Sequence, residues 1–336
     1  MSQSGHARFF VATTGDDSWS GRLAEPNGDR TDGPFATLHR ARDAVRESKD
    51  AANGLTEPAS VTIRGGAYFL RGTLVLTERD SGTPEFPVTW GAYPGERPVL
   101  SGGRVVTGWR PYKGSILQAD LPEARTDRFQ TRQLFYRGQR QRRARWPRFD
   151  PTDPIRGGWA FPEGSVPESE ARAFRFKPDG FPRRWSKPYE GEVRIFVGHS
   201  WCSNRVPIRS IDYEKRIVWL ARDTMHADYP PWYMKIALGE NSRFYAENIL
   251  EELSGPGEWC CDSSQGVLYF WPPEGRVEDG DVVVPLLDSL LRVRDGRWIT
   301  ISGLTLTHTT TGDDYHRNRL EGYGAMFPQQ GWPYCG

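Results

Sequence analysis

Short apolar segments with a period of two recur about every dozen residues in the first hundred residues of this chain. They are centred on Val61, Leu74, Val88 and Val99, and turns rich in Gly, Asp, Ser and Pro separate them. Because side chains alternate between the two faces of a strand, this pattern predicts short β-strands. Strands at such regular spacing suit a sandwich, a barrel or a solenoid.

One segment departs from this period. Leu38, Ala41 and Val45 fall at helical spacing, with Thr37 or Pro34 as the start signal and Asn53-Gly54 as the end. This predicts a single amphipathic helix that follows a short strand at residues 9–11. A solenoid needs its open end covered by something other than another repeat, and this helix is a natural cap.

The regular pattern stops near residue 105 and returns near residue 290. The middle is rich in Pro, Trp and Arg and has irregular strands, whereas residues 290–293 and 298–306 alternate cleanly again. An insertion within a solenoid explains this order. The predicted domains are 1–104, the cap and first rungs; 105–285, an inserted β-rich domain; and 286–336, a truncated return to the solenoid.

Composition narrows the function classes. The 44 Lys and Arg residues balance 43 Asp and Glu residues, so no overall field favours nucleic acid or an anionic membrane. Plentiful Gly, Pro and Trp favour strands and turns over long helices. No segment approaches the roughly 18 apolar residues of a membrane span, and no export signal precedes the first strand. We therefore expect no nucleic acid and no membrane as partners. The chain as given would be cytoplasmic.

Known cofactor and metal motifs do not occur in the sequence. The Gly-Gly pairs lack the following helix of a phosphate-binding loop, and there is no His-Glu metal helix or nucleophile elbow. The four cysteines show no zinc spacing, so free thiols in a reducing compartment are expected. We expect no cofactor and no metal, and the sequence gives no indication of the oligomeric state.

The order of several motifs resembles a known group of proteins. These motifs are residues 32–38 with the helix at 41–45, Gly65-Gly66-Ala67-Tyr68, residues 92–103, Arg143-Ala144-Arg145-Trp146-Pro147, residues 256–259 with 268–272, and Ile301-Ser302-Gly303-Leu304. In this order they resemble right-handed parallel β-helix (pectin-lyase-like) proteins. This group includes β-xylosidase-like and fucosidase- or xylanase-like glycoside hydrolases, families 120 and 141, which carry a domain inserted early in the helix. Proteins of this group are often exported, so the localisation of the chain stays open.

This resemblance implies an all-β chain: the start of a right-handed parallel β-helix with an N-terminal α-helical cap, interrupted by an inserted β-sandwich-like domain. It also implies a glycoside hydrolase acting on plant-type or bacterial polysaccharide. The group's acid and base carboxylates lie on rungs after the return strand, where this sequence ends, so we expect the fragment to be inactive. A non-catalytic carbohydrate-binding module, a polysaccharide lyase and a purely structural cap remain as alternatives.

Carboxylates near the end of the chain are the catalytic candidates. Glycoside hydrolysis needs two carboxylates roughly 5 to 9.5 Å apart. Asp313, Asp314 and Glu321 follow the return strand in a polar segment, and loops on a rigid scaffold often carry function. The alternative is a solvated loop. Asp313 and Asp314 would point in different directions in an extended segment, so they do not suit the pair together.

Arginine and tryptophan side chains are the candidates for binding an oligo- or polysaccharide. Six arginines between Arg137 and Arg148 suit sugar hydroxyls, uronate carboxylates, the chain's own acidic loops or nucleic acid. Indoles in Pro- and Gly-rich connections suit stacking on a sugar ring, although they also suit core packing. The predicted substrate-binding residues are Arg145, Trp146, Trp159, His199 and Trp201.

Overall fold

The computed structural model describes residues 7–126, 132–196, 203–224 and 238–310. These residues form 25 β-strands and a single α-helix, so the expectation of a mostly β chain is confirmed. No helix among them has the length and apolar character to span a bilayer. They divide into two compact units: residues 7–104 with 284–310, and residues 105–283.

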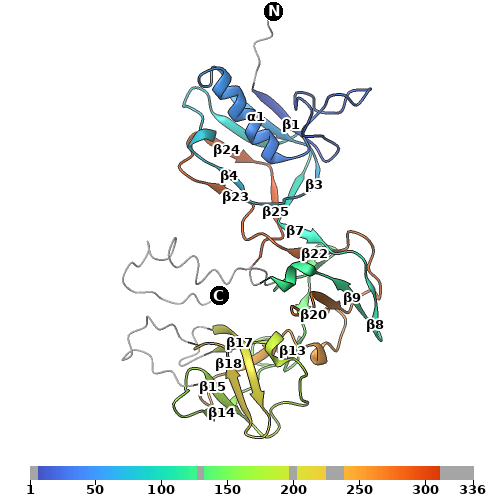
Figure 1. The fold of residues 1–336 in the computed structure, drawn as a ribbon, viewed down its shortest axis with the longest axis vertical. Helices are drawn as coiled ribbons and strands as arrows, with labels where there is room; N and C mark the ends of the chain where they lie inside the picture. Colours follow the sequence, from blue (N-terminus) through green and yellow to red (C-terminus); the bar gives the residue numbers. More distant parts are fainter. Residues whose placement is uncertain (1–6, 127–131, 197–202, 225–237, 311–336) are drawn as a thin grey trace, which may run out of the picture. The chain divides into compact units, whose positions relative to one another are not determined.

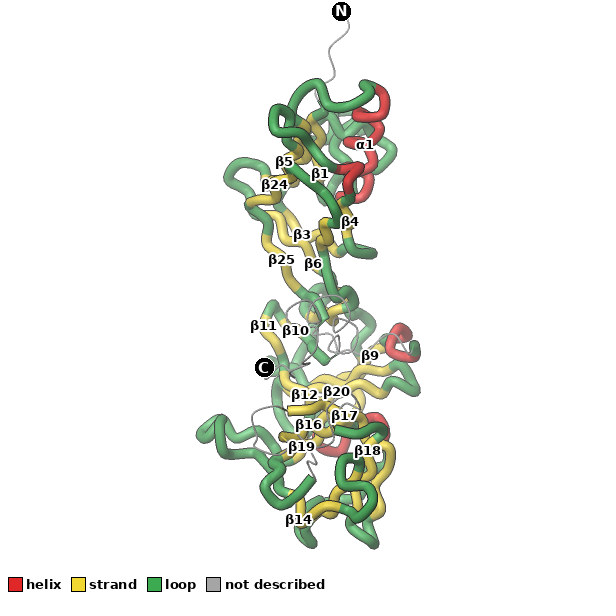
Figure 2. The backbone as a smooth tube through the Cα atoms, turned by 90° about the vertical axis from the view of Figure 1, so that its left-hand side faces the viewer, coloured by secondary structure: helices red, strands yellow, loops and turns green. Residues whose placement is uncertain are grey.

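The first unit contains three sheets in which every strand pairing is parallel. Figures 1 and 2 show their strands side by side within this unit. The sheets, in spatial order, are β1 (Arg8–Val11), β2 (Ala59–Ile63), β5 (Val88–Ala92) and β24 (Ile299–Ser302); β3 (Gly66–Phe69), β6 (Pro98–Ser101) and β25 (Thr305–Thr307); and β4 (Leu74–Leu76) with β23 (Leu291–Val293).

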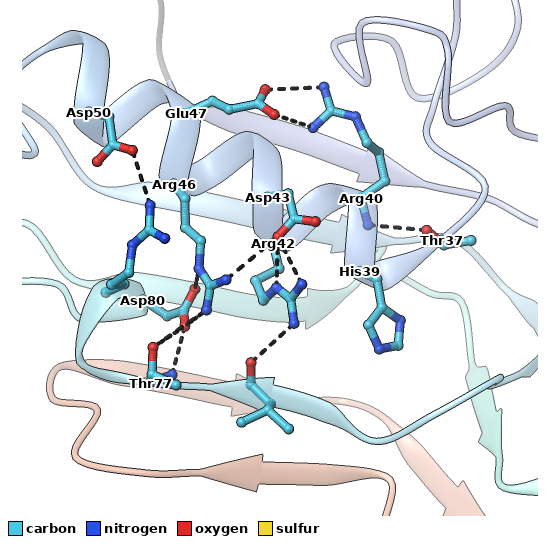
Figure 3. Close-up of polar contacts among 12 residues, drawn as sticks. Thr37, His39, Arg40, Arg42, Asp43, Arg46, Glu47, Asp50, Thr77 and Asp80 are labelled. Carbon is cyan, nitrogen blue, oxygen red and sulfur yellow. Dashed lines mark hydrogen bonds and ion pairs between the residues drawn. The ribbon is translucent and has the colours of Figure 1, made fainter.

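Helix α1 (Leu38–Ala51) lies beside β1 (Figure 1). The Thr37 side chain caps it by accepting a hydrogen bond from the Arg40 backbone N–H at 3.1 Å. On the polar side of α1, the Arg46 Nη2 lies 2.6 Å from an oxygen of the buried Asp80 carboxylate (Figure 3). Asp80 belongs to the 3₁₀ helix η1 (Glu78–Asp80). The predicted helix is therefore confirmed, and ion pairs attach it to the chain that follows β4.

Alternation along the strands explains the core of the first unit. Ala59, Val61 and Ile63 of β2 are buried, whereas the residues between them are partly exposed. Leu38, Ala41, Ala44 and Val45 of the helix are buried in the same cluster. The strands predicted around Val61, Leu74, Val88 and Val99 are confirmed as β2, β4, β5 and β6.

The second unit consists of three sheets that are antiparallel apart from the pairing of β12 with β20. Strands β7 and β22 include the points where the chain leaves and re-enters the first unit. With neighbouring strands named in the order in which they pair, the first sheet consists of β11 (Gln139–Arg140), β10 (Phe135–Tyr136), β22 (Val282–Pro285) and β7 (Gly103–Val105). The second consists of β12 (Arg142–Arg143), β20 (Glu258–Asp262), β21 (Val267–Phe270), β9 (Ile116–Asp120) and β8 (Arg110–Lys113). The third, with seven strands, consists of β13 (Arg145–Trp146), β19 (Phe244–Glu247), β16 (Glu192–Phe196), β17 (Ser203–Asp212), β18 (Ile217–Leu220), β15 (Ala173–Phe176) and β14 (Pro162–Ser165).

An apolar core covers one face of the seven-stranded sheet. Strands β16 and β19 each contribute alternate residues to it, namely Val193 and Ile195, and Phe244 and Ala246. Three 3₁₀ turns connect strands of this unit: η2 (Pro122–Arg125), η3 (Pro188–Glu190) and η4 (Leu250–Glu252). The remaining residues of β16 and β19 project from the opposite face, and this face carries the candidate site.

Candidate functional site

The opposite face of the seven-stranded sheet is rich in arginine. Cross-strand register places on it the residues that alternate with the apolar core positions of β13, β19, β16 and β17. We call this surface the arginine-rich face, and it consists of Arg145, Glu192, Arg194, Phe196, Arg205, Tyr245 and Glu247. Figure 2 shows β16, β17 and β19 next to one another.

Two carboxylates and three guanidinium groups meet at one end of this face, and we call them the charged cluster. Glu192 and Glu247 are directly opposite each other in the β16–β19 register. Arg132 donates two hydrogen bonds to the Glu192 carboxylate, at 2.8 and 2.9 Å. Arg143 Nη1 donates to both carboxylates, at 3.0 Å to Glu247. Arg205 Nε lies 3.2 Å from Glu247 and 3.6 Å from Glu192.

The charged cluster keeps Glu192 ionised. Burial alone would raise the pKa of this carboxyl group, but Arg143 and the paired Arg132 outweigh it and lower the pKa to about 2. The acid of a glycosidase instead needs a raised pKa, so that it holds a proton at neutral pH. Glu192 therefore suits electrostatic binding and does not suit proton donation.

A cavity of about 420 Å³ opens beside the charged cluster. Its volume lies within the range typical of small-molecule sites, roughly 300–1,000 Å³. Arg132, Arg143 and Glu192 line it, together with Arg125, Tyr189 and Glu190. The cavity is thus polar and charged, with an aromatic ring, 55% exposed, at Tyr189.

Aromatic rings gather farther along the same face. The Trp159 ring lies 5.1 Å from the ring of Tyr245 and 5.4 Å from that of Phe196, centre to centre. The Arg145 guanidinium stacks over Tyr245 at 3.6 Å, and that of Arg243 lies 4.8 Å from the centre of Trp159. We call these five residues the aromatic cluster. Along β16, the step from Glu192 to Phe196 spans roughly 13 Å at about 3.3 Å per residue.

Two of the predicted substrate-binding residues meet in this cluster. Arg145 and Trp159 lie within 5.7 Å of each other and share the arginine-rich face. Trp146 follows Arg145 directly, but the register turns it to the core face, where it packs on Phe181 and Phe244. The other predicted site residues lie outside the described part of the chain: His199, Trp201, Asp313, Asp314 and Glu321.

Several arginines between positions 137 and 148 are held by the chain's own carboxylates. Arg137 pairs with Asp281 at 2.9 Å and with Glu274 at 2.5 Å. Arg148 lies 3.3 Å from Glu258. Structural pairing, one of the alternatives considered from the sequence, therefore applies to these two arginines as it does to Arg143.

Four members of the charged cluster are not predicted from the sequence, namely Arg132, Glu192, Arg205 and Glu247. Two of them, Glu192 and Glu247, lie 55 positions apart in the chain and meet only through strand pairing. A local signal does exist: Glu192 and Arg194 alternate with Val193 and Ile195, which assigns the two polar residues to one face of a strand. Arg132 and Arg205 carry no such signal, because their partner Glu192 is distant in sequence.

Buried thiols are present in the second unit, but they are not reactive groups. Cys261 lines the cavity, and burial raises its pKa to about 12. Burial also raises the pKa of Cys260 well above its usual value, and both cysteines are free. No group of three or more His, Cys, Asp or Glu side chains among the described residues is arranged to hold a metal ion.

Comparison with known proteins shows similarity at the level of the fold. No protein-family model matches the chain, and no curated protein does. A solved structure described as a glycoside hydrolase has a TM-score of 0.72 at 23% identity, and the alignment covers 90% of this chain and 51% of that chain. A structure of XylC in complex with xylose has a TM-score of 0.33 at 14% identity, covering 90% of this chain and 35% of that one. The chain thus spans about half the length of the glycoside hydrolase whose fold it shares.

Proposed function

We propose that this chain is part of a carbohydrate-active protein of the glycoside hydrolase type, built on a right-handed parallel β-helix. The order of strands in the first unit supports the solenoid. Strands β2, β3 and β4 follow one another along the chain, and β5 and β6 then pair in parallel with β2 and β3. After the second unit, β23 pairs with β4, β24 with β5 and β25 with β6.

Each turn of the chain therefore lies on the previous turn, as in a β-helix, and the second unit is inserted between β6 and β23. Parallel crossover connections are right-handed in about 98% of cases, which supports the proposed hand. The outermost strands expose apolar side chains, among them Val293, Ile301 and Leu306. Such side chains suit the stacking of a further rung.

The observation that carries the functional proposal is the cavity of about 420 Å³ beside the charged cluster, at one end of the arginine-rich face, together with the aromatic cluster farther along that face. Saccharides offer hydroxyl groups to charged side chains and C–H faces to aromatic rings, and this face supplies both kinds of partner. Trp159 is partly exposed, and its indole N–H is held by the Ile155 carbonyl at 3.2 Å, so its ring is fixed in place. We assign to this face the binding of an oligo- or polysaccharide substrate.

The catalytic acid and base are proposed to lie outside the described residues, on Asp313, Asp314 or Glu321 or on further rungs. Glu192 does not suit the acid role because its pKa is about 2. The same observation favours a second candidate, a saccharide-binding module without catalysis. Hydrolysis of aryl glycosides or xylan-type oligosaccharides by a longer form of the protein that includes further rungs distinguishes the two: turnover supports the first, and binding without turnover supports the second.

Calorimetric titration of the full chain with xylan-type oligosaccharides tests the binding proposal itself. Trp159→Ala is expected to weaken binding by about tenfold, the loss of one stacked or edge contact. Trp109→Ala is the matched control, because its indole also donates to a backbone carbonyl in the same unit, at 3.0 Å to Val106, but it lies off this face. Equal affinities of Trp159→Ala, Trp109→Ala and the parent chain would contradict the proposal.

A further inference from the structure

We propose that the cavity beside the charged cluster recognises the carboxylate of an acidic sugar, a uronic acid unit within the oligosaccharide. This inference rests on the proposed saccharide binding and specifies the class of saccharide.

Positive charge exceeds negative charge in the cavity wall. Among the described lining residues, three arginines face two glutamates, and behind the wall Arg205 and Glu247 add one charge of each sign. A low-dielectric wall strengthens such an imbalance relative to bulk water. A neutral ligand leaves this excess uncompensated, whereas a single carboxylate compensates it.

Both carboxylates of the wall are already engaged. Glu190 accepts hydrogen bonds from the backbone N–H groups of Ser263 and Ser264, at 2.8 and 3.0 Å, and from the Ser263 hydroxyl. Glu192 accepts the paired hydrogen bonds of Arg132. Neither glutamate is therefore free to dominate the recognition of a ligand, and the wall offers chiefly donors.

One buried donor of the wall has no partner. The Nε of Arg143 is inaccessible to solvent and has no hydrogen-bond partner among the described residues. The Arg143 side chain is only 10% exposed, yet it lines the cavity. Because this nitrogen is closed to solvent, a ligand carboxylate in the cavity would meet the positive charge of the Arg143 guanidinium and would not bond to Nε itself.

A planar, singly charged group fits this wall better than a dianion. Guanidinium groups match carboxylates in plane and in the spacing of their donors. A phosphate dianion would instead meet Glu190 and Glu192 with a second negative charge. Tyr189, at the open side of the cavity, adds an aromatic face for the sugar ring that carries the carboxylate.

A matched pair of ligands tests the inference on the unmodified full chain. The probes are a xylan-type oligosaccharide that carries glucuronic acid and the same oligosaccharide after reduction of the carboxylate to a primary alcohol. We expect the acidic ligand to bind at least about tenfold more tightly, with an advantage that shrinks as salt rises. Equal affinities would overturn the inference while leaving saccharide binding intact. Binding of neither ligand would refute the proposed function and the inference with it.

A variant at the rim tests the assignment to this cavity. Arg125 is exposed, and its guanidinium donates to the Gln265 carbonyl at 2.9 and 2.6 Å, so Arg125→Gln leaves the buried cluster untouched. Arg125→Gln is expected to lower the affinity for the acidic ligand several-fold and to leave the affinity for the reduced ligand unchanged. Arg175→Gln is the control, since Arg175 donates to the Lys215 carbonyl at 2.7 Å away from the cavity. Equal effects of the two variants, or tighter binding of a sulfated neutral oligosaccharide than of the uronate, would overturn the assignment.

Discussion

Glu192 and Glu247 lie opposite each other on neighbouring strands, and one nitrogen of Arg143 donates a hydrogen bond to both carboxylates. Two like charges on paired strands would repel each other without this bridge. Arg132 and Arg205 complete the compensation from the sides. The charged cluster is therefore a single unit in which each group depends on the others.

Removal of Arg143 is expected to destabilise the second unit. Arg143→Gln leaves two buried carboxylates with less compensation, and the loss of one partner from a buried ion pair costs about 3–5 kcal/mol. Urea denaturation followed by tryptophan fluorescence measures the change. Arg172→Gln is the control, because its pair with Asp223 is half exposed and contributes less than about 1 kcal/mol. Similar losses in the two variants would contradict the dependence on Arg143.

The charged cluster also predicts an acid-sensitive stability. The pKa of Glu192 is about 2 in the folded chain and 4.5 ordinarily, so the unfolded chain binds the proton more readily between these values. The contribution of Glu192 is thus complete above pH 4.5 and is lost as the pH falls toward 2. Denaturation curves at several pH values are expected to show this decline in the parent chain. Glu192→Gln should flatten it, and an unchanged slope in the variant would be inconsistent with the paired carboxylate.

Trp146 and Trp159 are expected to separate stability from binding. On the core side, the Trp146 ring packs on that of Phe181, with the ring centres 4.7 Å apart. Trp146→Ala should therefore lower the free energy of unfolding by about 2 kcal/mol or more and leave the saccharide affinity of the folded chain unchanged. Trp159→Ala should cost less stability and reduce saccharide affinity. Thermal denaturation and calorimetric titration of both variants provide the two measurements. The reverse pattern would mean that the two faces of the sheet are wrongly assigned.

Local patterns in the sequence predict the first unit well. The alternation in Ala59–Ile63 and the helical spacing from Leu38 are signals carried by neighbouring residues, and both elements form where they are expected. The second unit is less predictable because its pairings are long-range. For example, strand β12 pairs with β20 in a register that places Arg142 beside Glu258, 116 positions later in the chain. Only the pairing of such distant strands decides which polar residues meet.

The dependence on long-range strand pairing also explains why the sequence predicts only part of the site. Arg145 and Trp146 are adjacent in a two-residue strand, and their opposite orientations follow from its pairing with Glu247 and Ala246. A strand of two residues shows no alternation of its own, so the sequence suggests sugar binding for both side chains. The meeting of Arg145 with Trp159 likewise depends on Tyr245, which belongs to another strand.

Cys260 and Cys261 are expected to resist alkylation in the folded chain. Burial disfavours both thiolates, and the thiolate is the nucleophile, so iodoacetamide at about pH 8 should leave these two residues unmodified. Mass spectrometry of the peptide that contains them gives the readout. The same treatment in concentrated guanidinium chloride should modify both residues. Modification of either thiol in the native chain would show that the cavity wall opens.

The turn between β24 and β25 is expected to require glycine at position 303. Gly303 has a φ of 73°, a conformation that disfavours other residues, and an added Cβ would lie 3.0 Å from the Ala92 Cβ. Gly95 has a similar φ of 79° in the same unit, but an added Cβ there would meet no atom within 4 Å. Both alanine variants bear the backbone strain, about 1 kcal/mol, whereas Gly303→Ala also forces β24 away from β5. Chemical denaturation should therefore show a clearly larger loss for Gly303→Ala. Equal losses would mean that the contact with Ala92 relaxes freely and that the two strands are not closely held at this turn.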